Sequence, residues 1–593
     1  MRLLPSCGGI LLLPVGPTDR EYKSEQVIAL TATFTAEPVE EPLNFWMNEL
    51  DTPCAVKFSP YNQVFQQLLD PASALSTNHS GLNVVIIRLE DWWDGAGDLH
   101  SGHDTREKFR ERVERHARDL FDAMKFASGN SRVPYLLCFC PASKQIQADE
   151  TLMEFFSLLE SQIAGRMEDV SGTYVVTSAE CKALYPVAEF EDQRANEASH
   201  VPYTGEFFHA LGTMIARRFY RIHTPPHKVI VLDCDNTLWQ GVCGEDGALG
   251  VTVGPPYKAL QEFMIAQRDA GMLVCLCSKN NEEDVWKVFE NNPGMVLKRE
   301  HFVSTRINWQ PKSENLRSLS AELQLGLDSF IFLDDSAIEC AEVEARCPDA
   351  LTLQLPEQES DFKKFLSHVW AFDHLKITEE DRQRSDLYAQ DAERKQALEQ
   401  WLRLDDFLAG LELQVEFLPM TKAEMPRVAQ LTQRTNQFNF TSVRRTDGEV
   451  ERLCTAGNAD CLVIRLRDRF GDYGLVGAMI FTRQPGLLDV DNVLLSCRAL
   501  GRRVEHRMLS HLGRIAQEES RKTVRINFVP TPKNKPARDF LESMGAVVED
   551  GNSIASRIDF ESERIAELSP FLTGKHLVGG SLPKAAPDAI HHV

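Results

Sequence analysis

The chain has 593 residues, enough for three or four domains at about 100–200 residues per domain. Hydrophobic residues make up 43% of it and charged residues 25%, a balance that excludes disorder throughout the chain. The formal net charge of −23 disfavours nucleic acid and anionic membranes as partners, because both repel an acidic surface.

Residues 1–25 are predicted to be a tail, and residues 26–222 to form an α/β domain. The runs VIALTATF, LNVVIIRL, VPYLLCFC and TYVVTS are apolar without alternation, which is typical of buried parallel strands. Segments 104–127 and 150–166, between these runs, have the spacing of amphipathic helices.

The fourteen cysteines indicate the redox surroundings of the chain. Several of them lie inside apolar strand-like runs, where a free thiol behaves as a small hydrophobe. No pair stands at zinc spacing with partner histidines, and a secreted protein would pair its cysteines. No run approaches the roughly 20 apolar residues of a membrane helix. We therefore expect a reduced, cytoplasmic protein.

A second α/β domain is predicted over residues 227–356, after the Pro-Pro pair at 225–226 breaks the chain. Its predicted strands are KVIVLD, GMLVCLCS, DSFIFLDD and ALTLQL. Helical patterns lie between these strands, at residues 256–270, 281–291, 313–324 and 336–346.

The remaining chain is predicted to hold a linker, a third domain and a tail. Residues 357–412 are charged and helix-like, and Thr378–Asp381 has the pattern of a helix-starting capping box. Residues 413–572 mix strands with two helices, which predicts an α+β domain. Residues 573–593 are rich in glycine and proline and are predicted to be flexible.

The strongest chemical signal is the segment KVIVLDCDNT, in which a buried strand ends at Asp233. In extended chain, residues two apart face the same side, so Asp233 and Asp235 are expected to face one reaction centre. Attack on a phosphate ester needs a nucleophile, an acid for the leaving oxygen and a divalent metal that neutralises charge. Two aspartates with Mg²⁺ meet these needs, since Mg²⁺ prefers oxygen ligands.

Three further elements fit the same chemistry. Ser278 ends a second buried strand and can bind a phosphoryl oxygen, and Lys312 opens a helix and can hold a cation against phosphate. Asp334 and Asp335 end a third strand as metal ligands. Open α/β sheets bind ligands at the carboxyl ends of their strands. Each element alone is common as a turn, a cap or a surface charge, but together they predict a phosphoryl-transfer site.

These residues resemble the four motifs of the haloacid dehalogenase superfamily. The strings VIVLDCDNTLWQGVCGEDG, SKNN, INWQPKSENL and FLDDSAIECAEV resemble its FkbH-like subfamily. TFTAEP, PYNQVFQQLLDP, RLEDWW and HVPYTGEFF resemble the subfamily's SGNH-like domain, and LTQRTNQFNFT and LSCRALGRRVEHRML its acetyltransferase-like domain. The implied fold is a Rossmann-like α/β haloacid-dehalogenase domain flanked by an N-terminal SGNH-like α/β domain and a C-terminal GNAT-like α+β domain.

The resemblance also implies roles for single residues. Asp233 would accept the phosphoryl group, and Asp235 would act as general acid and base while its backbone carbonyl binds Mg²⁺. Asp233, Asp334 and Asp335 would complete the metal site. The residues implied to bind phosphate or substrate are Thr237, Ser278 and Lys312.

The glyceryl-loading members of the subfamily remove phosphate from 1,3-bisphosphoglycerate and pass the glyceryl group to an acyl carrier protein thiol, in polyketide-type pathways. The resemblance therefore implies a carrier protein, through its phosphopantetheine arm, and a small phosphorylated substrate as partners. Two alternatives stay open: a stand-alone phosphatase on another small metabolite, and a non-catalytic scaffold that docks carrier proteins.

Weaker signals concern an acyl-carrying thiol and the two outer domains. Cys243 and Cys497 are candidate thiols, although a structural cysteine is the commoner outcome for each. In the first domain, Thr33, Thr35, Asn78 and His200 stand where an active SGNH enzyme would carry its catalytic blocks, and we expect this domain to dock a partner or shape the site. Candidates for acyl or phosphopantetheine binding are Arg498, Gly501 and Arg502. A polar run that fits either substrate binding or a helix cap comprises Gln433, Arg434, Asn436, Gln437 and Asn439.

Overall fold

A computed structural model of the chain forms two compact units, Met1–Arg382 and Gln383–Val593. Each unit is described by itself. The residues described are 26–93, 103–382, 384, 387–388, 412–455, 459–469, 471–546 and 556–568, with the backbone of residues 2–6 and 9–13. The predicted tail at 573–593 and most of the predicted linker after residue 388 lie outside them.

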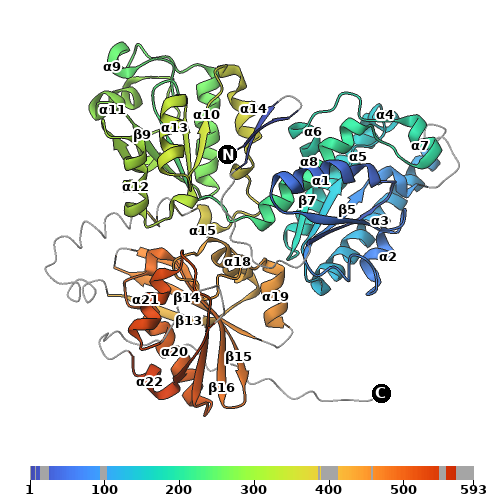
Figure 1. The fold of residues 1–593 in the computed structure, drawn as a ribbon. Helices are drawn as coiled ribbons and strands as arrows, with labels where there is room; N and C mark the ends of the chain where they lie inside the picture. The colour runs from blue at the N-terminus through green and yellow to red at the C-terminus, as the bar shows by residue number, and fades with distance from the viewer. Residues whose placement is uncertain are drawn as a thin grey trace. The chain divides into compact units, whose positions relative to one another are not determined.

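The first sheet of unit 1 has five parallel strands in the order β4-β3-β5-β6-β7 (Figure 1). Leu43 of α1 and Phe208 of α8 pack on one face of this sheet, and Phe109 of α3 and Phe156 of α5 on the other. The strands are β3 (Gln26–Ala32), β4 (Cys54–Phe58), β5 (Gly81–Ile87), β6 (Tyr135–Phe139) and β7 (Thr173–Val176). The helices are α1 (Glu40–Glu49), α2 (Val64–Leu69), α3 (His103–Asn130), α4 (Lys144–Gln147), α5 (Glu150–Glu168), α6 (Ser178–Leu184), α7 (Gln193–Ser199) and α8 (Gly205–His223).

The second sheet of unit 1 also has five parallel strands, in the order β10-β9-β8-β11-β12. The central strand β8 is completely buried, because the apolar run VIVL packs on both of its faces. The strands are β8 (Val229–Leu232), β9 (Leu273–Ser278), β10 (Phe302–Ile307), β11 (Phe330–Asp334) and β12 (Leu351–Gln354). The helices are α9 (Cys243–Asp246), α10 (Pro255–Asp269), α11 (Glu282–Asn291), α12 (Lys312–Leu323), α13 (Ala337–Arg346) and α14 (Phe362–Ser367).

The two sheets of unit 1 share a packed junction. Arg217 of α8 is buried and donates from Nε to Asp373 at 2.6 Å and from NH2 to the Ser367 carbonyl at 2.9 Å. Trp370 packs in the core of the first sheet, whereas Phe362 of α14 packs in the core of the second. Residues 362–373, which the sequence assigns to a linker, therefore belong to unit 1, because their apolar side chains close both cores.

Some strands differ from the elements that the sequence predicted. The edge strands β4 and β10 were not predicted, because half-buried residues give no continuous apolar run. The predicted N-terminal tail contains an antiparallel pair, β1 (Arg2–Ser6) and β2 (Gly9–Leu13).

The predicted capping box at Thr378–Asp381 is present. The Thr378 amide donates to Asp381 Oδ2 at 3.0 Å, and the Asp381 amide donates to Thr378 Oγ1 at 3.3 Å. Helix α15 (Glu379–Arg382) begins there.

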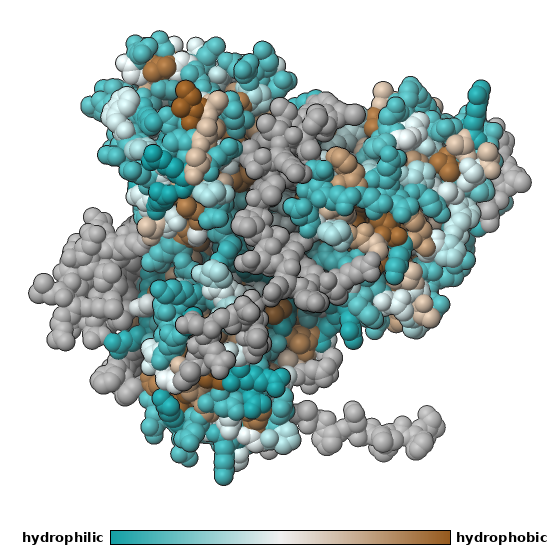
Figure 2. Space-filling model, viewed as in Figure 1, coloured by the Kyte–Doolittle hydropathy of each residue, from teal (hydrophilic) through white to brown (hydrophobic). Residues whose placement is uncertain are grey.

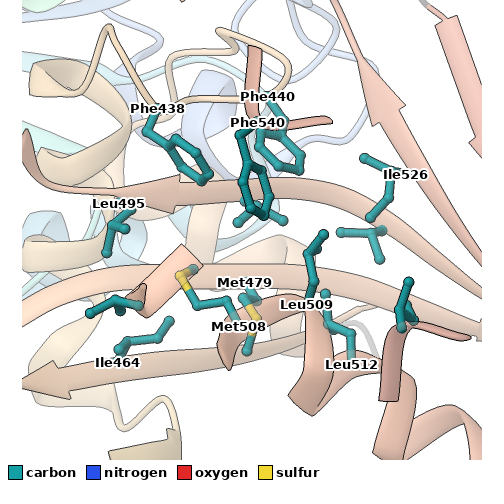
Figure 3. Packing of buried hydrophobic residues seen from close by; sticks show 14 of the residues in the cluster. Phe438, Phe440, Ile464, Met479, Leu495, Met508, Leu509, Leu512, Ile526 and Phe540 are labelled. Carbon is teal, nitrogen blue, oxygen red and sulfur yellow. The ribbon is translucent and has the colours of Figure 1, made fainter. Parts of the chain in front are cut away.

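The described residues of unit 2 form a six-stranded mixed sheet in the order β13-β14-β15-β16-β17-β18, and among these strands β16 and β17 are the parallel neighbours. Figure 3 shows Met508, Leu509 and Leu512 of α20 packed against sheet residues such as Ile464 and Met479. The strands are β13 (Gln414–Pro419), β14 (Asp460–Asp468), β15 (Gly471–Gln484), β16 (Leu487–Leu495), β17 (Thr523–Phe528) and β18 (Ser556–Glu561). The helices are α18 (Met425–Arg434), α19 (Asp447–Thr455), α20 (Val504–Glu518), α21 (Lys535–Ser543) and α22 (Ser562–Ala566).

The predicted multi-domain α/β class is confirmed by these three sheets and their helices. On the face shown in Figure 2, the described surface is mostly hydrophilic, with hydrophobic residues in small separate groups. Among the described helices, none combines the length and the apolar character that crossing a membrane requires.

Candidate active site

The residues of the predicted site meet at one edge of the second sheet. Asp233 directly follows β8, Ser278 ends β9, Asp334 ends β11 and Lys312 is the first residue of α12. The strands are parallel, so their carboxyl ends lie at the same edge. The sheet also reverses its strand order at β8, since β9 lies on one side of it and β11 on the other. Such a switch point is where open α/β sheets bind ligands.

Three carboxylates and one ammonium form the centre of the site. Each of Asp233, Asp334 and Asp335 contributes one carboxylate oxygen, and these three oxygens lie within 4.8 Å of one another. Lys312 Nζ lies 2.8 Å from Asp233 Oδ1 and also contacts Asp334 Oδ2. Asp334 is fully buried, and its other oxygen accepts from the Ser336 amide at 2.8 Å. The lysine therefore offsets part of the negative charge.

Burial and charge shift the acidities of this cluster. Burial raises the pKa of Asp233, and the neighbouring Asp334 raises it further, while Lys312 opposes both. Burial also raises the pKa of Asp334 and of Asp335. For Lys312, burial alone would lower the pKa, but the two carboxylates outweigh it and the pKa is raised. The ammonium therefore stays charged, and the site has more negative charge than one lysine neutralises.

Thr237 and Asp235 lie on the loop after β8 in different surroundings. Thr237 is buried and its hydroxyl donates to Asp335 at 3.4 Å. The side chain of Asp235 is outside the three-carboxylate cluster. Its Oδ1 accepts from Trp239 Nε1 at 2.8 Å and from the Cys243 amide at 3.0 Å. The predicted same-side placement of Asp233 and Asp235 thus does not bring their carboxylates into one cluster, because the loop bends and supplies Asp235 with its own donors.

Asn280 is a site residue that the sequence analysis did not single out. It is buried, and its Nδ2 lies 3.0 Å from Asp235 Oδ2 and 3.0 Å from Ser278 Oγ. It stands two residues after Ser278, the same spacing that pointed from Asp233 to Asp235. That spacing was the available signal for Asn280. Trp239 gave none, because an aromatic residue after a strand is usually part of the core.

The donor set fits a hard divalent cation. Three carboxylates that converge from two strands are the ligand type that Mg²⁺ takes, with water in its remaining positions. Their close approach in a buried place is costly without a second positive charge besides Lys312. The residues present therefore fit Mg²⁺.

The two candidate thiols lie in different environments. Cys243 is buried, its Sγ lies 3.6 Å from Asn280 Oδ1, and burial together with the nearby Asp235 raises the pKa of this thiol to about 12. Such a thiol is a poor nucleophile. Cys497 in unit 2 is half-buried, and its Sγ lies 3.9 Å from the Tyr388 hydroxyl.

In the first domain, the four residues at the positions expected for SGNH catalytic residues make mainly structural contacts. Thr33 donates to Asp91 at 2.8 Å, and Thr35 donates to the Ser199 carbonyl at 2.9 Å. Asn78 donates to the Val27 carbonyl at 3.1 Å. The ring of His200 stacks on Tyr61, with the ring centres 4.9 Å apart.

In unit 2, the residues suggested for acyl binding follow β16. Arg498 is buried, Arg502 donates to its carbonyl and lies 4.9 Å over the ring of Tyr473, and Gly501 has a φ of +73°. They share one turn before α20.

The polar run after α18 is largely tied into its own loop. Asn439 Oδ1 accepts from the Ser442 amide at 2.9 Å and from Asn492 Nδ2 at 3.0 Å. Gln433 Nε2 donates to the Arg445 carbonyl at 3.3 Å, and Asn436 accepts from Arg444. These bonds favour the helix-end loop over a substrate site for these three residues.

Comparisons with known proteins add a likeness of fold. No family model and no curated protein sequence matches this chain. The N-terminal part of the protein BF1531 from Bacteroides fragilis, which contains a phosphatase domain and was crystallised with Mg, is similar over 59% of this chain and 95% of its own, with 21% identity and a TM-score of 0.51. PaiA N-acetyltransferase from Thermoplasma acidophilum, in complex with coenzyme A, is similar over 25% of this chain and 99% of its own, with 10% identity and a TM-score of 0.21. The first likeness supports a shared fold, and the second carries no argument.

Proposed function

We propose that this protein is a Mg²⁺-dependent enzyme that transfers a phosphoryl group from a small phosphorylated substrate to Asp233. The observation that carries the proposal is the buried cluster of Asp233, Asp334 and Asp335, whose oxygens lie within 4.8 Å, with Lys312 in contact with the first two. The fold shared with a phosphatase domain crystallised with Mg supports the same chemistry.

In the proposed reaction, a carboxylate oxygen of Asp233 forms a bond to phosphorus and the bond between phosphorus and the leaving oxygen breaks. Asp235 gives a proton to that oxygen when it needs one. Water then attacks the aspartyl phosphate, Asp235 takes up its proton, and phosphate leaves. Lys312 and Ser278 bind the phosphoryl oxygens. Mg²⁺, held by the three carboxylates and the Asp235 carbonyl, would neutralise phosphate charge.

The finer proposal concerns the substrate and the acceptor. The resemblance of the catalytic motifs supports 1,3-bisphosphoglycerate as substrate and the phosphopantetheine thiol of an acyl carrier protein as glyceryl acceptor, in a polyketide-type pathway. In that reaction the thiol attacks the C1 acyl carbon and displaces the C1 phosphate, and the Asp233 chemistry removes the C3 phosphate. Of the two candidate thiols for an enzyme-bound intermediate, Cys497 is the better one, because Cys243 is buried and its pKa is raised. Since the described cysteines are all free thiols, we also propose a reducing, cytoplasmic location.

The test has two arms. Purified protein is assayed with p-nitrophenyl phosphate and with acetyl phosphate, with Mg²⁺ and with a chelator, and Asp233→Asn is expected to abolish turnover. Asp269→Asn on the exposed end of α10 is the matched control. The second arm incubates protein, Mg²⁺, 1,3-bisphosphoglycerate and a holo carrier protein, and intact-protein mass spectrometry follows the glyceryl adduct.

The outcomes separate the alternatives. A glyceryl adduct that depends on Asp233 supports the full proposal. Phosphate release without any carrier adduct supports a stand-alone phosphatase. If Asp233→Asn changes neither reaction nor pathway output in cells, the protein is a docking scaffold and the enzymatic proposal is wrong.

A further inference from the structure

Asn280 connects two parts of the site that come from different strands. It follows β9 and its side-chain amide reaches Ser278 on its own segment and Asp235 on the loop after β8, each at 3.0 Å. Its Oδ1 faces the Cys243 thiol at 3.6 Å, which sets the direction of the amide: Nδ2 faces the two oxygens. The side chain is only 6% exposed, so water does not compete freely for these bonds.

This arrangement determines what Ser278 can do. Because Asn280 Nδ2 donates to Ser278 Oγ, the serine oxygen is an acceptor on that side, and its own hydrogen is left for another partner. Ser278 ends β9, which pairs with β8, so its hydroxyl lies at the sheet edge where Asp233 follows β8 and is close enough to interact with it. Asn280 therefore directs the serine hydrogen toward the place where a phosphoryl group would meet Asp233.

The same amide holds Asp235. Of the donors to this carboxylate, Trp239 Nε1 and the Cys243 amide belong to the segment from β8 to the start of α9, whereas Asn280 belongs to the loop after the neighbouring strand β9. The loop donors alone fix Asp235 relative to its own segment. The Asn280 bond fixes it relative to Ser278, and hence relative to the phosphate-binding edge.

We propose that Asn280 is a positioning residue that orients the Ser278 hydroxyl and the Asp235 carboxylate together. This inference rests on the proposed phosphoryl transfer. It predicts two separable defects when the amide is lost. The Ser278 defect lowers kcat/KM for every phosphate substrate. Because kcat/KM reports the steps up to release of the leaving group, the Asp235 defect lowers it only when the leaving oxygen needs a proton.

The experiment compares two leaving groups in the full-length protein with Mg²⁺. p-Nitrophenyl phosphate releases a stable phenolate that needs no proton, and glycerol 3-phosphate releases an alkoxide that does. For Asn280→Ala, kcat/KM is expected to fall about tenfold on the aryl phosphate and about a hundredfold on the alkyl phosphate. A merely structural role would lower both by the same factor.

Variants with single defects calibrate this result. Ser278→Ala should lower kcat/KM by the same factor for both substrates. Asp235→Asn should lower kcat/KM mainly for the alkyl phosphate. In the Asp235→Asn background, adding Asn280→Ala should cause no further leaving-group dependence. The matched control is Asn281→Ala, the next asparagine, which is exposed and bonds the Glu283 amide at 3.3 Å. For this control, the ratio of kcat/KM on the aryl phosphate to kcat/KM on the alkyl phosphate should equal that of the wild type.

If Asn280→Ala lowers kcat/KM by the same factor for both phosphates, the inference is overturned and the proposed function still stands. If the wild-type protein turns over neither of these phosphates and also neither acetyl phosphate nor 1,3-bisphosphoglycerate, the proposed function fails instead. A crystal structure of Asn280→Ala then decides the positioning role without any turnover. Unchanged side-chain positions of Asp235 and Ser278 would overturn it, and displaced ones would support it.

Discussion

Lys312 lies between two buried carboxylates, so its charge matters for stability as well as for phosphate binding. In Lys312→Met, Asp233 and Asp334 remain buried without the cation that contacts both. Removing one partner of a buried ion pair usually costs about 3–5 kcal/mol. We therefore expect the free energy of unfolding, measured with urea and circular dichroism in the absence of metal, to fall by about that amount. Added Mg²⁺ should restore part of it.

The control for this change is Lys287→Met on the exposed face of α11, where only about 0.5 kcal/mol either way is expected. If Lys312→Met were as stable as the wild type without metal, Asp233 and Asp334 would not both be ionised in the folded protein, contrary to the proposed metal site.

Thiol reactivity gives a second test at this scale. Cys243 is 2% exposed and burial raises its pKa to about 12, so almost none of it is thiolate near neutral pH. Iodoacetamide at pH 7.5 should therefore modify the half-buried Cys497 well before Cys243, as peptide mass mapping would measure. Faster labelling of Cys243 would return it to the list of candidate acyl carriers.

The residues that could be predicted from the sequence are those whose chemistry shows in a strand-end pattern. Asp233, Ser278 and the Asp334–Asp335 pair each close an apolar run, and Lys312 opens the helix between the second and third of these runs. The spacing from Ser278 could have pointed to Asn280, but the bonds that Asn280 and Trp239 make to Asp235 could not be predicted, because they depend on how the loop after β8 bends toward β9. Pairwise spacing within one segment does not contain that information.

At the scale of elements, burial on both faces decided what was predictable. Central strands such as β5 and β8 have continuous apolar runs and were predicted within a few residues. The edge strands β4 and β10 have half-buried residues on nearly every position, so periodicity did not reveal them. In unit 2, the two predicted helices, at residues 422–435 and 502–519, correspond to α18 and α20, whereas α19, α21, α22 and β18 were not predicted.

One contact between elements predicts a pH effect. Glu160 of α5 is buried and accepts from the Ser178 amide at 3.0 Å and from its hydroxyl, at the start of α6. Burial raises its pKa from 4.5 to about 7, so the folded protein holds a proton that the unfolded chain releases. Stability should therefore fall as pH rises from 4.5 to 7, by an amount on the order of 3 kcal/mol.

Glu160→Gln removes this titration while keeping an acceptor for Ser178. The difference in unfolding free energy, variant minus wild type, should therefore grow between pH 5 and pH 8, as urea titrations at each pH would show. A difference that stays constant over this range would mean that Glu160 ionises in the folded protein as it does in the unfolded chain.

At the scale of the whole molecule, the Pro-Pro pair at 225–226 predicted a boundary between two α/β domains. In the structure a five-stranded sheet lies on each side of this pair, and both sheets belong to the unit that ends at Arg382. The reason lies in residues that the sequence assigned to a linker: Trp370 fills the core of the first sheet, and Phe362 and Phe372 fill that of the second. A charged, helix-like composition concealed these few apolar anchors.

This junction predicts how unit 1 tolerates truncation. A chain that ends after Arg382 keeps all of these anchors and should unfold in one cooperative transition, with Mg²⁺-dependent phosphate hydrolysis retained. A chain that ends after Gln358 loses Phe362, Trp370 and Phe372 and exposes Arg217 where Asp373 paired with it. Each large buried side chain contributes about 3–5 kcal/mol, which is comparable to the whole stability of a domain. The shorter chain should therefore lose its cooperative transition in thermal circular dichroism and its activity, and a stable, active fragment ending at Gln358 would show that the second sheet folds without these anchors.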